Sequence, residues 1–190
     1  MKRKLILASG SPRRKELLSK IGIPFEIIVS DYEEDMTLPF SPDELVKHLS
    51  RGKAESVAKM HRDAVVLSAD TIVAYGATVL GKPHTPERTR EMLRLLSGKP
   101  HSVFTGFTVI LEEEGKNISR AVETKVYFKT LSDKDIEEYI ATGEPLEKAG
   151  AYAVQLIGQK FIEKVEGDIS NVIGLPVDDV EKILREEFGF

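Results

Sequence analysis

The chain has 190 residues, 41% of them hydrophobic and 31% charged, with no cysteine and a formal net charge of −4. No apolar run approaches the roughly 18 residues that span a bilayer, and the acidic balance argues against a general affinity for nucleic acid. The lack of cysteine excludes disulfides, zinc–thiolate sites and thiol catalysis, so any metal must be bound by oxygen or histidine. We therefore expect one globular domain over residues 1–190 that binds neither a membrane nor nucleic acid.

A short basic segment opens the chain, but it does not have the pattern of a secretion signal. Residues 2–4 are Lys-Arg-Lys, and the apolar run behind them is four residues long and ends in Ser-Gly-Ser-Pro. A signal peptide needs about 7–15 apolar residues at this point. We therefore expect a cytoplasmic protein.

The first elements alternate between strand and helix. A strand is expected over residues 5–8 and a helix over residues 12–21, which opens with a Ser-Pro pair. Serine suits the N-cap, and proline suits the first helical position because it has no amide to leave unpaired. A second strand over residues 25–29 leads into an acidic segment, residues 31–35. Loops that follow strands are common places for functional sites.

The first turn of this helix carries an unusual charge. Arg13 and Arg14 stand where free amides and the helix dipole are already positive, and where acidic residues are normally preferred. A phosphate bound among the amides, Ser9, Ser11 and the guanidinium groups would remove the resulting repulsion. The alternative is that both arginines turn into solvent.

The next helix is expected from Pro42, and it has a lysine within its apolar stripe. Leu45, Leu49, Lys53 and Val57 recur at intervals of four, so Lys53 lies between apolar neighbours on one face. Either its stem extends until the ammonium reaches water, or the lysine has a functional role.

Asp70 follows a short strand expected over residues 64–69, and apolar residues resume after Thr71. A carboxylate that interrupts a buried run is unfavourable unless it binds a cation or accepts hydrogen bonds, so we favour a functional role. Lys82 lies between a glycine and a proline, in a tight loop that could direct its ammonium to the same place.

The remaining segments predict three helices and four strands. The helices are expected over residues 86–96, over residues 132–141 and from residue 176, and the strands over residues 102–111, 121–131, 161–165 and 169–173. The second long strand alternates apolar and polar residues, so one of its faces is solvated. We expect an α/β domain with a mixed, twisted sheet flanked by helices.

The unusual residues together fit phosphate-ester chemistry. Glu33, Glu34 and Asp70 could hold Mg²⁺ or Mn²⁺ through oxygen, a carboxylate can deprotonate a water, and the basic residues would offset phosphate charge. The four histidines have no metal-ligand spacing, and neither a P-loop nor a dinucleotide-binding glycine motif occurs.

Five motifs in order resemble the Maf family along the whole chain. They are Ala8 to Leu18, Ala69-Asp70-Thr71, Gly81-Lys82-Pro83, Lys148 to Tyr152, and Gly174-Leu175-Pro176. The resemblance implies a Maf/ITPase-like fold and a house-cleaning enzyme that cuts nucleoside triphosphates between the α and β phosphates with a divalent metal, Mg²⁺ or Mn²⁺. The family is also known for inhibiting septum formation, so a regulator of cell division that binds nucleotides without turnover is the alternative. The resemblance leaves a homodimer open.

The resemblance assigns roles to ten residues. It makes Asp70 the proton acceptor and Glu34 its companion at the metal. It assigns phosphate contacts to Ser9, Ser11, Arg14, Lys53 and Lys82. It assigns selection of the base to Arg13, Thr71 and Gln155. A related subgroup, which resembles a 7-methyl-GTP hydrolase, has an aromatic residue, Gln and Glu at the last three positions. The resemblance therefore implies dTTP and UTP as substrates, with modified pyrimidine nucleotides as further candidates.

Two positions depart from the family pattern. Glu147 replaces the usual Asp before Lys-Ala-Gly-Ala-Tyr, and Leu156 replaces the usual Gly after Gln155. We expect Leu156 to place a bulky side chain beside the base pocket, which would disfavour purines. A third interpretation, a phosphorylated docking site at Ser11-Pro12, is disfavoured because the serine suits a half-buried helix cap.

Overall fold

The computed structural model describes residues 3–190, which divide into two compact units. Unit 1 contains residues 3–70, 105–122 and 174–190, and unit 2 contains residues 71–104 and 123–173. The strands follow the order β2-β1-β3-β5-β6-β7, with β4 paired to β3. Parallel pairs at β1 and antiparallel pairs at β4 and β7 make the sheet mixed. The predicted α/β class with a mixed, twisted sheet flanked by helices is confirmed, whereas the single domain stays a prediction.

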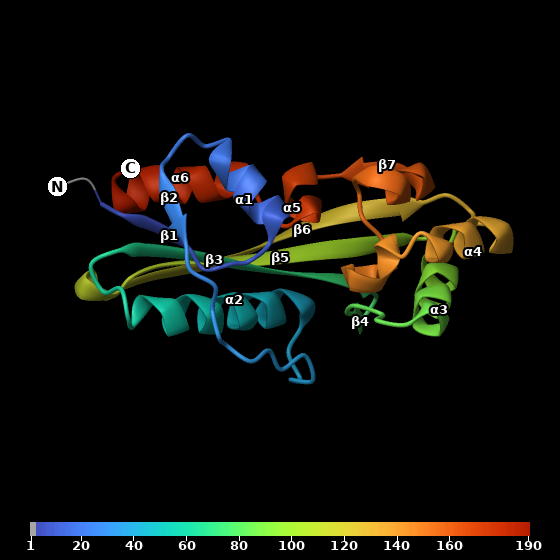
Figure 1. Cartoon of the computed structure of the whole chain (residues 1–190), viewed down its shortest axis with the longest axis horizontal. Helices are drawn as coiled ribbons and strands as arrows, with labels where there is room; N and C mark the ends of the chain where they lie inside the picture. The colour runs from blue at the N-terminus through green and yellow to red at the C-terminus, as the bar shows by residue number, and fades with distance from the viewer. Residues whose placement is uncertain (1–2) are drawn as a thin grey trace. The chain divides into compact units, whose positions relative to one another are not determined.

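Unit 1 is built on the parallel strands at the start of the chain. Its elements are β1 (Leu5–Leu7), α1 (Pro12–Ser19), β2 (Phe25–Ile27), α2 (Pro42–Ala58), the first part of β3 (Val65–Tyr75), the later part of β5 (Pro100–Leu111), η1 (Glu112–Glu114), the first part of β6 (Lys116–Phe128) and α6 (Val177–Phe188). Helix α2 lies on one face of the strands, and α1 and α6 lie on the other (Figure 1). The apolar stripe predicted for α2 is buried at Leu45, Leu49 and Val57.

Unit 2 has a core rich in aromatic side chains. Its elements are β4 (Thr78–Leu80), α3 (Pro86–Leu96), α4 (Asp133–Ala141), the 3₁₀ helices η2 (Glu144–Glu147), η3 (Ala149–Ala151) and η4 (Leu156–Phe161), β7 (Ile162–Glu166) and α5 (Ile169–Ile173), together with the remaining parts of β3, β5 and β6. Tyr139, Phe128 and Tyr152 are buried in one cluster. The helices predicted over residues 86–96 and 132–141 are confirmed.

Two sequence-based expectations are wrong. Residues 169–173 form a helix, α5, instead of a strand. Asp168 Oδ1 accepts from the amide of Ser170 (2.7 Å), and Asn171 Nδ2 donates to the carbonyl of Val103 (3.0 Å), so polar side chains override the β-branched pattern. The strand expected over residues 64–69 extends to Tyr75, and Asp70 therefore lies inside β3 and not at its end.

No helix within residues 3–190 is long and apolar enough to cross a membrane. The cytoplasmic location stays a prediction.

Candidate active site

The predicted anion-binding loop lies in unit 1, at the start of α1. Ser11 is the N-cap, and its Oγ accepts from the amide of Arg14 (3.5 Å). Ser9 Oγ accepts from the amide of Ser11 (3.3 Å) and from Nη1 of Arg14 (3.2 Å). Nε of Arg14 donates to the carbonyl of Gly174 (2.9 Å), which links the first motif of the chain to the last. The alternative that Arg14 turns into solvent is wrong.

The charge of Arg14 connects this loop to two carboxylates. Burial has the largest effect and lowers the pKa of Arg14. The charge of Asp70 raises this pKa, the neighbouring Arg13 lowers it and the charge of Glu34 raises it. The guanidinium of Arg14 therefore lies within electrostatic range of both carboxylates.

Lys53 lies between these two carboxylates. Its Nζ is 2.7 Å from Glu34 Oε1 and also donates to Asp70 Oδ1. The side chains of Lys53 and Asp70 are only 12% and 9% exposed, whereas that of Glu34 is 44% exposed. The ammonium thus faces inward, and the alternative in which Lys53 reaches out to water is wrong. An ion pair this deeply buried requires both partners, because either charge alone would be uncompensated.

A glycine in β5 allows α2 to approach the sheet closely. A Cβ at Gly106 would lie 2.3 Å from the carbonyl carbon and oxygen of Val46, a residue of α2. Ser50 of the same helix pairs its Oγ with Thr108 Oγ1 of β5 at 2.9 Å. This close packing brings α2 near the strands, so that Lys53 reaches Asp70 inside β3.

Glu34 and Asp70 are the metal ligands that the resemblance implies, and their chemistry fits Mg²⁺ or Mn²⁺. Residues 3–190 contain no cluster of three or more His, Cys, Asp or Glu side chains suited to a metal. Two carboxylates are sufficient when substrate phosphates and waters complete the shell, which is the usual arrangement for Mg²⁺. Both carboxylates already contact one small cationic group, the ammonium of Lys53. The donor set is therefore suited to a metal that binds together with the substrate.

Three predicted site residues, Thr71, Lys82 and Gln155, belong to unit 2. The Lys82 side chain is exposed, and its Nζ lies 3.5 Å from Oε2 of Glu147, the first departure from the family pattern. Gln155 is half-buried, at the N-cap of η4, and Thr71 is half-buried in β3. The roles of these three residues in binding the substrate stay predictions.

The turn that follows Gln155 is held by a residue that the sequence did not single out. Glu144 accepts from the hydroxyl of Tyr139 (2.7 Å) and from the amides of Ile157 and Gly158 (both 3.3 Å). In the sequence, the position of Glu144 between a glycine and a proline indicated only the end of a helix. The turn places Leu156 at φ 62°, with 75% of its surface exposed. This left-handed backbone favours glycine, which is a physical reason for the glycine in the family pattern.

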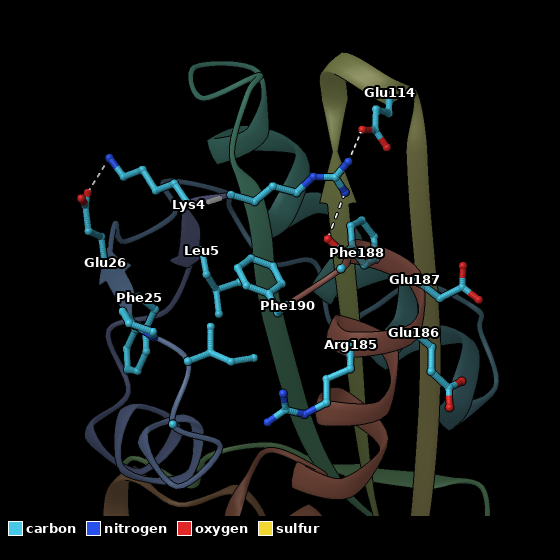
Figure 2. Close-up of a pocket in the computed structure, with 15 residues that line it drawn as sticks. Lys4, Leu5, Phe25, Glu26, Glu114, Arg185, Glu186, Glu187, Phe188 and Phe190 are labelled. Carbon is cyan, nitrogen blue, oxygen red and sulfur yellow. Dashed lines mark hydrogen bonds and ion pairs between the residues drawn. The ribbon is translucent and has the colours of Figure 1, made fainter. Parts of the chain in front are cut away.

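A separate pocket of about 1010 Å³ lies in unit 1, between the early strands and the end of α6 (Figure 2). Of the described residues that line it, none is a predicted site residue. Its basic side chains already have acidic partners, since Arg3 pairs with Glu114, Lys4 with Glu26 and Arg185 with Glu181. The pocket therefore has little uncompensated positive charge to attract a phosphate.

The chain matches a known protein family over almost its whole length. The family model described as Maf-like protein matches residues 4–187, and the chain belongs to this family. Curated relatives named dTTP/UTP pyrophosphatase, from Bacillus cereus and Bacillus anthracis, are each 46% identical over 184 residues, which cover 97% of this chain and 95% of theirs. The resemblance based on five sequence motifs is confirmed.

Solved structures resemble the chain more distantly. The Ham1 protein of Staphylococcus aureus has a TM-score of 0.47 and 12% identity, covering 66% of this chain and 72% of that one. The nucleoside-triphosphatase / dITP/XTP pyrophosphatase of Mycobacterium abscessus has a TM-score of 0.47 and 15% identity, covering 67% and 75%.

Proposed function

We propose that this chain is a metal-dependent pyrophosphatase that hydrolyses dTTP and UTP to the monophosphate and pyrophosphate. The observation that carries the proposal is the buried ammonium of Lys53 between Glu34 and Asp70, two carboxylates that lie within electrostatic range of Arg14. Membership of the Maf-like family supports the reaction, and the name of the curated relatives supports the two substrates.

The start of α1 binds the triphosphate. Ser9, Ser11 and Arg14 surround a helix N-terminus, where the helix dipole favours an anion. The fork of the Arg14 guanidinium suits two phosphate oxygens at once. Lys82 adds a further cation for the phosphates.

Lys53 changes partners when the substrate binds. In the free protein its ammonium compensates the buried charge of Asp70. Phosphate oxygens offer the ammonium strong charge-assisted hydrogen bonds in exchange. Asp70 is then able to accept a proton from the water that attacks the α phosphorus, while the bond to the α–β bridging oxygen breaks and pyrophosphate leaves. Glu34 and Asp70 would hold the divalent metal, which when bound would supply positive charge that stabilises the phosphate oxygens.

We assign recognition of the nucleotide base to Arg13, Thr71 and Gln155. The amide of Gln155 can donate and accept at once, which matches the adjacent carbonyl and N–H of a uracil or thymine edge. A carboxylate at this position could only accept, and would suit the two neighbouring donors of guanine.

The decisive experiment incubates the pure protein with dTTP, UTP, CTP, GTP and 7-methyl-GTP in Mg²⁺ or Mn²⁺ and assays both pyrophosphate and orthophosphate. We expect pyrophosphate, released fastest from dTTP and UTP, and no release in excess chelator. Orthophosphate with a nucleoside diphosphate, or full activity in chelator, would contradict the proposed reaction. Tight nucleotide binding without any release would support the regulator that acts without turnover.

A further inference from the structure

One face of α2 docks the loop that precedes it, residues 30–40, which carries Glu34. His48, Gly52 and Ser56 follow one another at intervals of four, so they form a single stripe along the helix, here called the docking stripe. Each member of the stripe contacts the loop. The position of the loop is therefore defined at three successive turns of α2.

Serine hydroxyls fix the start of the loop. Ser56 Oγ donates to the carbonyl of Lys53 (3.1 Å). Ser56 Oγ also lies 2.8 Å from Ser30 Oγ, in a hydrogen bond in which either hydroxyl can be the donor. Ser30 Oγ also accepts from the amide of Tyr32 (3.1 Å). These hydrogen bonds hold the backbone of Tyr32 next to the helix.

The ring of Tyr32 lies on Gly52 because that position has no side chain. A Cβ on Gly52 would lie 2.4 Å from both Cε2 and Cζ of Tyr32, compared with 3.4–4 Å for ordinary contact. The hydroxyl of Tyr32 is 3.2 Å from Nε2 of His48, and the ring of His48 packs against that of Phe40 with 5.2 Å between centroids. Any side chain at position 52 would therefore push the ring of Tyr32 away.

We propose that Tyr32 and Gly52 are positioning residues that set where Glu34 stands in the active site. Glu34 is two residues after Tyr32, and its partner Lys53 is the residue after Gly52. Glycine inside a helix is less favourable than alanine, so its presence in α2 indicates a packing requirement. The inference rests on the proposed function, because Glu34 holds the metal only if that function is correct.

The test is a double-mutant cycle of Gly52→Ala and Tyr32→Ala in the full chain, with dTTP as substrate and Mn²⁺ as metal. An alanine at position 52 displaces the ring by about 1 Å, and a displacement of this size can lower a rate by up to about 10²-fold. Disturbing a residue that orients a metal ligand typically weakens metal affinity by about 10–100-fold. We expect Gly52→Ala to raise the Mn²⁺ concentration for half-maximal activity by about tenfold or more.

When Tyr32 is already alanine, Gly52→Ala is expected to leave the Mn²⁺ requirement almost unchanged, because no ring remains to be displaced. Tyr32→Phe keeps the ring on Gly52, and its Mn²⁺ requirement should stay close to that of the wild type. Glu55→Ala is the matched control, an alanine on α2 outside the docking stripe, and it should leave the Mn²⁺ requirement unchanged. The proposal would be overturned if Gly52→Ala raised the Mn²⁺ requirement equally in the wild-type and Tyr32→Ala backgrounds, or raised it in neither.

Hydrogen exchange of the amides of residues 30–40 gives a measurement that is independent of activity. Gly52→Ala should speed exchange when Tyr32 is present and should add nothing to Tyr32→Ala. A wild-type protein that hydrolyses no nucleotide would refute the proposed function, and the exchange cycle would still show whether the pair positions the loop. Unchanged exchange in Gly52→Ala would overturn the positioning role by itself.

Discussion

Replacing Lys53 by methionine should destabilise the protein more than replacing Asp70 by asparagine. Methionine keeps much of the lysine stem but leaves the carboxylate of Asp70, only 9% exposed, without its ammonium partner. Removing one partner of a buried ion pair typically costs about 3–5 kcal/mol, because the remaining charge is uncompensated. We expect a loss of about this size in the free energy of unfolding of Lys53→Met at pH 7.

Asp70→Asn should have a smaller effect on stability because Lys53 retains Glu34, at 2.7 Å, as a partner. The expected loss is about 1.5–3 kcal/mol, the value of a hydrogen bond to a charged group. The effect on turnover should be much larger, about a hundredfold or more with nucleotide binding retained, since the amide cannot accept the proton. Near wild-type turnover in Asp70→Asn would move the catalytic role to Glu33 or Glu34.

The double variant Lys53→Met/Asp70→Asn tests whether the loss in Lys53→Met comes from the uncompensated carboxylate, because the double variant has neither of the two buried charges. Urea unfolding should show that its loss is smaller than the sum of the two single losses by about 0.5–3 kcal/mol, the coupling energy typical of residues in direct contact. A loss below about 1 kcal/mol in Lys53→Met, typical of exposed ion pairs, would refute the reasoning. A double variant whose loss equals the sum of the single losses would refute it as well.

Three further predictions concern unit 2. Burial lowers the pKa of His101 from 6.5 to about 4. The free energy of unfolding should therefore fall by about 3 kcal/mol in total as the pH drops from about 6.5 to about 4, because the unfolded chain binds a proton that the folded protein does not. The thermal unfolding of His101→Gln should depend less on pH across this range. Leu156→Gly should raise the free energy of unfolding by up to about 1 kcal/mol by relieving the left-handed backbone, whereas the control Leu156→Ala should not. Gln155→Glu should shift kcat/KM from dTTP and UTP toward GTP by about tenfold to a hundredfold, and an unchanged ranking would rule out its role in base selection.

The sequence predicted those elements whose boundaries are set by local chemistry. Ser11 before Pro12, Ser41 before Pro42 and Ser132 three residues before Asp135 mark helix starts, and the structure has a helix at each. Capping depends on side chains within a few residues of the helix end, so a single sequence contains the required information.

Elements that depend on distant polar contacts could not be predicted. The β-branched residues of 169–173 are typical of a strand, but the amide of Asn171 is bonded to Val103 and Thr124, which are 68 and 47 residues away in the chain. For β3 the charge of Asp70 indicated an interruption, although a partner on α2 compensates this charge and the strand continues. In both cases tertiary contacts decide the local structure.

In the candidate site, too, the sequence indicated which residues are important but not which residues they contact. The burial expected around Lys53 and Asp70 singled out both residues, because a charge in an apolar run needs compensation. Their pairing could not be derived from the residues alone, since they are 17 positions apart on different elements. Gly52 gave no signal at all, since a glycine inside a helix indicates only reduced helix propensity when its neighbours in space are unknown. Its importance depends on the ring of Tyr32, 20 residues earlier, and the substitution Gly52→Ala that would strengthen an isolated helix should therefore impair this site.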